Sequence, residues 1–155
     1  MPLNEDFIDA LRALVGDRLS TGQSVREQHG DDLSYHPASA PDVVVFATST
    51  EDVSNIVKLC AKHKVPVIPY GAGTSLEGHL SALQGGVSID LTQMNEVLDV
   101  RTDDLDVTVQ AGVTRKQLDR HLHNTGLFFP VDPGADASLG GMVATRASGT
   151  NAVRY

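Results

Sequence analysis

The sequence predicts an α+β fold in which a small parallel βαβ lobe is followed by a mixed or antiparallel lobe. A β-branched apolar segment at 43–47 leads into a helical pattern and then a second apolar segment, which is typical of a βαβ unit. Two strand-like segments within 97–111 flank a polar turn. The composition changes near residue 95, so we expect lobes of about 40–95 and 96–155.

The chain divides into an N-terminal helix with its connection, residues 1–39, and a main domain, residues 40–155. Apolar residues recur at helical spacing over 4–19, which predicts an amphipathic helix. Residues 20–41 are polar and rich in glycine, proline and aspartate, so we predict a long connection.

The first lobe begins with a strand at 43–47, whose continuous β-branched run suits burial on both faces. A helix is predicted over about 51–64, and Val67-Ile68 resume as a strand. This spacing predicts that the two strands form a parallel pair. A further strand is predicted at 87–91, where the residues alternate in polarity.

The second lobe begins with segments 97–100 and 106–111, which we predict to form an antiparallel hairpin. The sequence from Thr114 to Gln117 fits a capping box, which opens a helix that is predicted to reach about Asn124. Gly126 is then expected to adopt the left-handed conformation that ends many helices.

Charge and cysteine content exclude several classes of protein. The net charge is −8, with 20 acidic and 12 basic residues, which argues against nonspecific binding to nucleic acid. Cys60 is the single cysteine, so it forms no internal disulfide, and its apolar helical surroundings predict a buried thiol. We recognise no signal peptide and no transmembrane segment, so we expect a cytoplasmic protein.

Residues 69–78 read Pro-Tyr-Gly-Ala-Gly-Thr-Ser-Leu-Glu-Gly and directly follow a predicted strand. Glycines let backbone N–H groups converge on an anion, so this loop predicts a cofactor that bears phosphate. The Rossmann pattern fails because Leu76 stands where its third glycine is required. The Walker pattern fails because His79-Leu80 replace its lysine and hydroxyl residue. A tight turn without a ligand remains an alternative.

A second stretch of small residues covers 128–141 and continues over 144–151. Its glycines and prolines argue against an ordinary helix start. Two stretches of small residues that are far apart in the sequence could line one extended ligand. The chain stops at Tyr155 without a turn, a cap or a polar tail, so we expect it to be a piece of a larger protein.

Three segments together resemble a known family: 69–78, 132–141 and 147–155. Their order and spacing are similar to the FAD-binding domain of FAD-linked D-lactate dehydrogenases. These belong to the vanillyl-alcohol-oxidase/PCMH flavoprotein superfamily, with the glycolate oxidase flavin subunit as a close relative. The resemblance covers roughly 40–155 and implies a PCMH-type FAD-binding domain that is truncated at its C-terminus.

The resemblance also implies which residues bind the cofactor. The first loop would cradle the FAD pyrophosphate, and the later segments would run along the ribityl chain and the isoalloxazine. The implied cofactor-binding residues are Tyr70, Gly71, Ala72, Gly73, Thr74, Ser75, Gly78, Pro133, Gly134, Ser138, Leu139, Gly140, Gly141, Ala144, Thr145, Ser148 and Gly149.

Some relatives attach FAD covalently through a histidine where this chain has Thr74, so noncovalent FAD is expected. We assign His79, slightly further on, neither a covalent nor a catalytic role. Many relatives carry asparagine where this chain has Arg146, so a specific flavin contact is in doubt there. For the intact protein, the resemblance implies oxidation of a D-2-hydroxy acid to the 2-keto acid, with electrons passing to an external acceptor.

In the family, a separate cap domain supplies the substrate pocket, and we expect that this chain does not include it. We find no catalytic acid–base set and no metal site, so the fragment by itself is expected to be inactive. His29, His36 and His63 are isolated and are expected to be solvated or to cap helices. His121 and His123 are two positions apart on a predicted helix, so they point in different directions.

Two further readings remain open. The chain could be a non-catalytic module that carries a flavin or a nucleotide. It could instead be an incomplete domain that is stable only with a partner chain, or as a homodimer that covers an open sheet edge.

Overall fold

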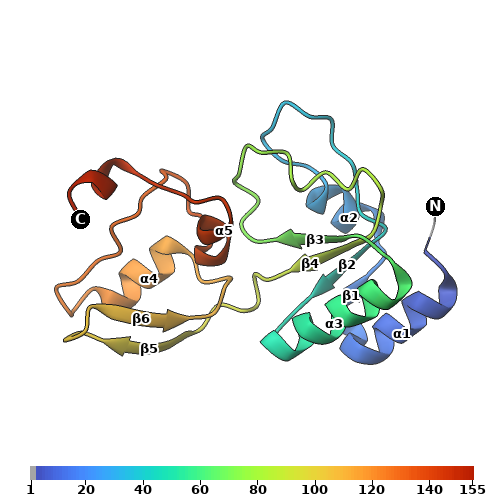
Figure 1. Ribbon diagram of the computed structural model, residues 1–155, viewed down its shortest axis with the longest axis horizontal. Helices are drawn as coiled ribbons and strands as arrows, with labels where there is room; N and C mark the ends of the chain where they lie inside the picture. The colour runs from blue at the N-terminus through green and yellow to red at the C-terminus, as the bar shows by residue number, and fades with distance from the viewer. Residues whose placement is uncertain (1–2) are drawn as a thin grey trace.

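Two β-sheets of different size organise the chain (Figure 1). The computed structural model describes residues 3–155. The larger sheet has the strand order β1-β2-β4-β3, with β1 antiparallel to β2 and the other neighbours parallel. Its strands are β1 (Leu19–Ser20), β2 (Val43–Phe46), β3 (Val67–Tyr70) and β4 (Val87–Asp90). The smaller sheet is an antiparallel hairpin of β5 (Val97–Arg101) and β6 (Asp106–Val109), as predicted.

Two helices pack together against one face of the larger sheet (Figure 1). They are α1 (Glu5–Val15), which Asn4 caps, and α3 (Thr50–His63), which Ser49 caps. Helix α1 ends earlier than predicted, because Gly16 adopts φ +60° and starts the 3-10 turn η1 (Gly16–Arg18). The core between the helices and the sheet contains Cys60, which is buried as predicted.

The opposite face of the sheet carries a helix that the sequence did not predict. Helix α2 (Gln23–His29) lies within the segment 20–41, which we expected to be a connection, and it contacts β2. It is short and polar, and His29 is its one buried residue. The prediction was wrong because this helix has no apolar stripe of its own and depends on its contacts with the sheet.

Strand β4 lies between β2 and β3, so the predicted pairing of 43–47 with 67–68 was also wrong. The two strands do run in the same direction, but each of them pairs with β4. All four residues of β4 are buried, including Ser88 and Asp90. Its alternation in polarity therefore reflects two covered faces, not one core face and one solvent face.

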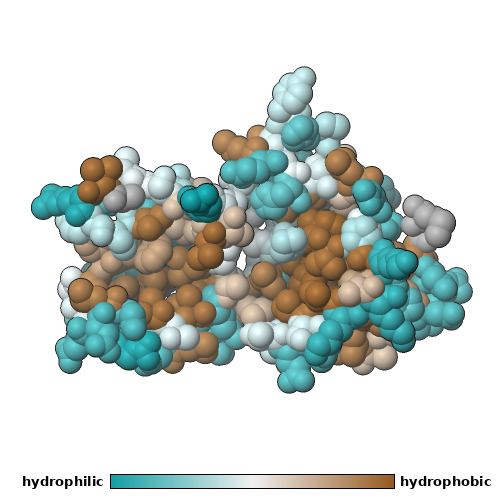
Figure 2. Space-filling view, in the orientation of Figure 1, coloured by the Kyte–Doolittle hydropathy of each residue, from teal (hydrophilic) through white to brown (hydrophobic). Residues whose placement is uncertain are grey.

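The hairpin is covered by α4 (Arg115–Leu122) and α5 (Leu139–Ala144), and together they enclose a second core. Helix α4 starts with the predicted capping box and ends at Leu122, two residues before the predicted end. Gly126 has the predicted positive φ, at +76°. The 3-10 turn η2 (Thr150–Val153) follows α5. The molecule thus has a first half, built on the larger sheet, and a second half, built on the hairpin. Figure 2 shows apolar residues gathered over each half, with weakly polar residues between them.

Helix α5 contradicts the expectation that 128–141 contains no helix start. Ser138 caps it by accepting a hydrogen bond from the backbone N–H of Gly141 at 3.3 Å. Gly140 packs against Ala111, and a Cβ at Gly140 would lie 2.8 Å from the Cβ of that alanine. Gly140 therefore allows α5 to pack closely on the segment that follows β6, which the sequence pattern did not reveal.

Candidate functional site

The glycine-rich loop begins where β3 ends, at the carboxyl edge of the parallel strands. Open parallel sheets commonly bind ligands at this edge. Gly73 adopts φ +66°, and a Cβ there would lie 2.9 Å from the hydroxyl oxygen of Tyr70. The loop therefore folds back over the last side chain of its own strand. Only glycine fits this position without strain.

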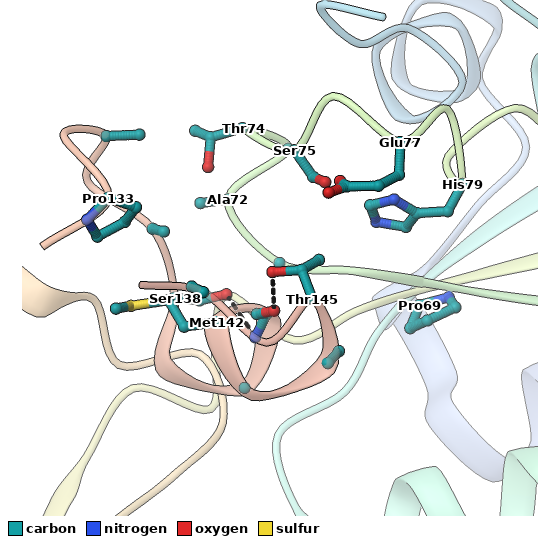
Figure 3. Close-up of a pocket in the computed structure, with 18 of the residues that line it drawn as sticks. Pro69, Ala72, Thr74, Ser75, Glu77, His79, Pro133, Ser138, Met142 and Thr145 are labelled. Atoms are coloured by element: carbon teal, nitrogen blue, oxygen red, sulfur yellow. Dashed lines mark hydrogen bonds between the residues drawn. The ribbon is translucent and has the colours of Figure 1, made fainter. Parts of the chain in front are cut away.

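The second small-residue segment reaches the same place from the other half of the molecule. A side-chain oxygen of Asp136 accepts a hydrogen bond from the backbone N–H of Lys116 at 3.1 Å, which ties the segment to the start of α4. The Thr145 hydroxyl donates to the carbonyl of Gly141 at 3.1 Å within α5 (Figure 3). The first bond anchors the segment to α4, and the second stabilises the end of α5.

The two segments meet at Gly71 and Ser138. A Cβ at Gly71 would collide with the hydroxyl oxygen of Ser138, so the backbone of one segment lies directly against the side chain of the other. Between them lies a cleft of about 880 Å³. Figure 3 shows Thr74 and Ser75 on one side of this cleft and Met142 and Thr145 on the other. This volume lies within the usual range for ligand pockets.

Most of the sequence-predicted site residues line this one cleft. They are Tyr70, Gly71, Ala72, Gly73, Thr74, Ser75, Pro133, Ser138, Gly140, Gly141, Ala144, Thr145 and Ser148. The other four predicted residues are absent from its lining. Gly78 packs against His36, Gly149 lies against the backbone of Asp132, and Leu139 is buried in the second core. Gly134 has φ +87° and open space around it.

Three lining residues with polar or charged side chains were not among the predicted site residues: Glu77, His79 and Arg146. Figure 3 shows Glu77 and His79 beside Ser75 along the first loop. Arg146 follows α5 in a left-handed conformation, with φ +54°. It makes no ion pair within residues 3–155, so its charge is available to an anionic ligand. Glu77 and Arg146 lie inside the two small-residue segments, and His79 directly follows the first one.

The cleft also contains a buried polar atom without a partner. The hydroxyl oxygen of Ser75 is buried and makes no hydrogen bond to any residue that the structure describes. A buried hydroxyl without a hydrogen bond is costly, so this atom indicates a missing partner in the cleft. The neighbouring glycines leave backbone space for a phosphate group beside it.

A second cavity of about 300 Å³ adjoins the first loop. It shares Gly71, Ala72 and Ser138 with the main cleft. Its other lining residues are polar or small: Thr92, Asn95, Gly112, Thr114, Gln117, Arg120 and Asp136. The contact of Gly71 with Ser138 thus separates the main cleft from a smaller cavity that is lined mostly by polar or small residues.

His29 contradicts the expectation that it is solvated or caps a helix. It is 3% exposed, and its Nε2 atom lies 2.8 Å from Oδ2 of Asp90. The ring centroid lies 4.3 Å from that of Tyr70, at the start of the glycine loop. Burial is the main reason that the pKa of Tyr70 is raised, and the charge of Asp90 adds to it. No periodic pattern in the sequence marks this cluster, because its members come from three separate elements.

Across residues 3–155, no three His, Cys, Asp or Glu side chains are grouped closely enough to hold a metal ion. The helices in that range are all too short or too polar to cross a lipid bilayer.

Comparison with known proteins places this geometry among flavoproteins. The family described as "FAD binding domain" matches residues 41–155. The chain is 56% identical over 152 residues to "Probable D-lactate dehydrogenase, mitochondrial" of Danio rerio, which covers 97% of the chain and 31% of that relative. It is 33% identical over 119 residues to "Glycolate oxidase subunit GlcD" of Bacillus subtilis, covering 76% of the chain and 25% of the relative.

A solved structure of alkyldihydroxyacetonephosphate synthase has a TM-score of 0.89 and 29% sequence identity, and it covers 99% of the chain and 31% of that protein. The chain spans about a quarter to a third of the length of these relatives.

Proposed function

Because the chain belongs to the family of FAD-binding domains, we propose that it forms the FAD-binding part of an oxidoreductase that oxidises a D-2-hydroxy acid to the 2-keto acid. The resemblance, the α+β fold and FAD as cofactor are confirmed. The observation that carries the proposal is the contact of Gly71 with Ser138, where two distant small-residue segments form one cleft. The names of the relatives support a substrate of the D-lactate or glycolate type.

The residues present fit FAD. Backbone N–H groups of 71–75 would hold the pyrophosphate, and the Ser75 hydroxyl would gain the partner that it lacks. Arg146 would supply the positive charge, because the loop itself contains no lysine. The small side chains of 138–148 would let the planar ring pass at backbone distance. FAD, when bound, supplies the acceptor for the hydride that leaves the hydroxy acid.

We expect FAD to be bound noncovalently. Thr74, which lines the cleft, stands where the resemblance implies the attachment point, and a threonine hydroxyl is a weak nucleophile at its ordinary pKa. His79 also lines the cleft, and it offers an imidazole elsewhere in the loop. Denaturing the FAD-loaded protein should release all of the flavin into the supernatant. Flavin that stays with the precipitated chain would contradict this expectation.

Substrate binding and electron transfer concern the whole protein. We propose that a cap domain outside this chain supplies the hydroxy-acid pocket and that electrons pass to an external acceptor. Residues 1–155 alone should therefore turn over little or no D-lactate. A cytoplasmic location and a homodimer remain predictions from the sequence, and the Danio rerio relative is named as mitochondrial.

The decisive experiment places a methyl group at the point where the two segments meet. Gly71→Ala would push against the Ser138 hydroxyl, so FAD affinity should fall by about tenfold to a hundredfold, since overpacking typically costs about 1–3 kcal/mol. Titration of the apoprotein with FAD, followed by quenching of flavin fluorescence, measures this. Ser138→Ala in the same chain removes the colliding atom and should restore part of the affinity.

Gly22→Ala is the matched control, because a Cβ there lies 3.5 Å from the nearest atom, in ordinary contact. Its FAD affinity should equal that of the unmodified protein. Unchanged affinity in Gly71→Ala, or a colourless protein that takes up no FAD, would contradict the proposed function. A protein that binds FAD but whose complete form never reduces it with a D-2-hydroxy acid would instead favour the carrier module.

A further inference from the structure

Two buried polar side chains, His29 and Asp90, lie beside Tyr70, which is partly buried and lines the cleft at the start of the glycine loop. His29 comes from α2, Asp90 from the end of β4 and Tyr70 from the end of β3. His29 and Asp90 are each 3% exposed, although both can carry charge. Buried charges are retained at a cost unless they are paired, so this arrangement needs an explanation.

Hydrogen-bond geometry shows that the pair of His29 and Asp90 holds an additional proton. The Nδ1 atom of His29 lies 2.7 Å from the Val25 carbonyl, which can only accept, so Nδ1 carries a hydrogen. The contact of 2.8 Å between Nε2 and the Asp90 carboxyl oxygen requires a second one. The other oxygen of Asp90 accepts from the backbone N–H and the hydroxyl of Thr92, at 2.7 and 2.6 Å. These bonds favour the carboxylate, so the ring carries the positive charge.

The protonated ring supports the loop through Tyr70. Its centroid lies 4.3 Å from that of the Tyr70 ring, and the Phe46 ring of β2 lies edge-on to it at 5.8 Å. The Tyr70 hydroxyl in turn lies under Gly73, where a Cβ would be 2.9 Å away. A continuous series of contacts thus joins the buried ion pair to the backbone that lines the cleft.

We propose that His29 is a positioning residue for FAD: its protonated ring, held by Asp90, fixes Tyr70 and thereby the glycine loop in the shape that binds the cofactor. This inference rests on the proposed function, because it takes the cleft to be the FAD site.

The proposal has a definite pH dependence. Burial lowers the pKa of His29, but the hydrogen bonds to Asp90 and Val25 and the charge of Asp90 outweigh it, so the pKa lies above its ordinary 6.5. The titratable groups that face the ring are Asp90 from β4 and Tyr70 from β3, while β2 presents the uncharged Phe46. The contribution of the protonated His29 ring to FAD affinity is complete below pH 6.5 and is lost as the pH rises through the raised pKa of His29. FAD affinity should therefore fall in alkaline solution.

The test uses the whole protein that carries this chain, freed of FAD. The FAD dissociation constant is measured from slightly acidic to alkaline pH, and the His29 ring is titrated by NMR with and without FAD. We expect about tenfold weaker binding once the ring is deprotonated, which corresponds to a pKa of His29 raised by about one unit when FAD binds. His29→Gln, which keeps a hydrogen-bond donor but no charge, should bind FAD more weakly and with little dependence on pH.

Two variants test whether the effect passes through Tyr70. The ring edge of Tyr70 also lies under Gly73, with its Cζ atom 3.2 Å from the position of a Cβ there, so Tyr70→Phe keeps a contact with the loop and should retain the pH profile. Tyr70→Leu removes the ring, so His29 should still titrate while FAD affinity no longer follows that titration. Circular dichroism establishes that each variant is folded.

FAD affinity that stays constant while His29 titrates in the unmodified protein would overturn the inference and leave the proposed function intact. A His29→Gln variant that keeps the full pH profile would do the same. Failure to bind FAD at every pH would instead overturn the proposed function itself.

Discussion

The wall of the cleft that follows β3 is anchored by buried side chains from distant parts of the chain, whereas the wall that leads into α5 is anchored mainly by hydrogen bonds near helix starts. Tyr70 of the first wall rests on His29, whose partner Asp90 is 61 residues further along the sequence. In the second wall, Ser138 bonds Gly141 three residues away, and Asp136 bonds Lys116 of α4. Substitutions far from the cleft should therefore disturb the first wall, and nearby ones the second.

The same contrast extends to the two cores. The larger sheet is covered on both faces, by α1 and α3 on one and by α2 on the other, so β4 is buried throughout. The hairpin of β5 and β6 has one packed face, and its strands are only partly buried. Each half has its own apolar core, which predicts that each can be weakened separately.

The largest expected effect on stability comes from truncating a buried side chain in one core at a time. Ile56→Ala in the first core and Leu118→Ala in the second each remove a fully buried side chain and should each cost about 2–5 kcal/mol. Hydrogen exchange should show faster opening of β4 amides in the first variant and of β5 amides in the second. Equal acceleration at both strands in both variants would show that the halves unfold as one unit and would break the comparison.

A smaller effect is expected at the capping box that anchors the second wall. The Thr114 hydroxyl oxygen accepts from the N–H of Gln117 at 3.3 Å, and the Gln117 side chain accepts from the N–H of Thr114 at 2.9 Å. Thr114→Ala should lower the free energy of unfolding by about 1 kcal/mol and weaken FAD binding slightly, while Thr114→Ser should change neither. Urea denaturation measures the first quantity. A larger loss of FAD affinity than Gly71→Ala produces would show that the second wall is the less robust of the two.

The smallest expected effect on stability comes from removing an ion pair. Arg18 and Asp52 lie 2.5 Å apart and are mostly buried, and the hydrogen bond from Arg18 is the main reason that the pKa of Asp52 lies far below its usual 3.8. Asp52→Asn should therefore lower stability by about 1 kcal/mol or less above pH 3.8, and the difference should vanish as the pH falls through the lowered pKa. Denaturant unfolding at neutral and acidic pH measures it.

Asp106→Asn is the control for that measurement in the second half. Its pair with Arg101 is half exposed at 2.7 Å, so water and salt screen it, and no measurable change is expected. Equal losses from the two substitutions would contradict the difference in burial between the halves.

Neighbouring residues carried enough information to predict several elements from the sequence. The capping box at Thr114 and Gln117, the hairpin, helix α3 and the buried Cys60 all depend on patterns within one or two turns or strands. The two small-residue segments could likewise be recognised as one candidate site, since glycine permits the close approach that the structure shows at Gly71.

Only the tertiary structure decided the position of β4 between β2 and β3, the formation of α2 and α5, and the burial of His29 against Asp90. Each of these depends on surfaces that come from segments far apart in the chain. A short polar helix such as α2 is not stable by its own propensity and forms because the sheet offers it a surface and a carboxylate. Local patterns therefore determined which segments fold and where a ligand is expected, while packing between distant segments determined what supports them.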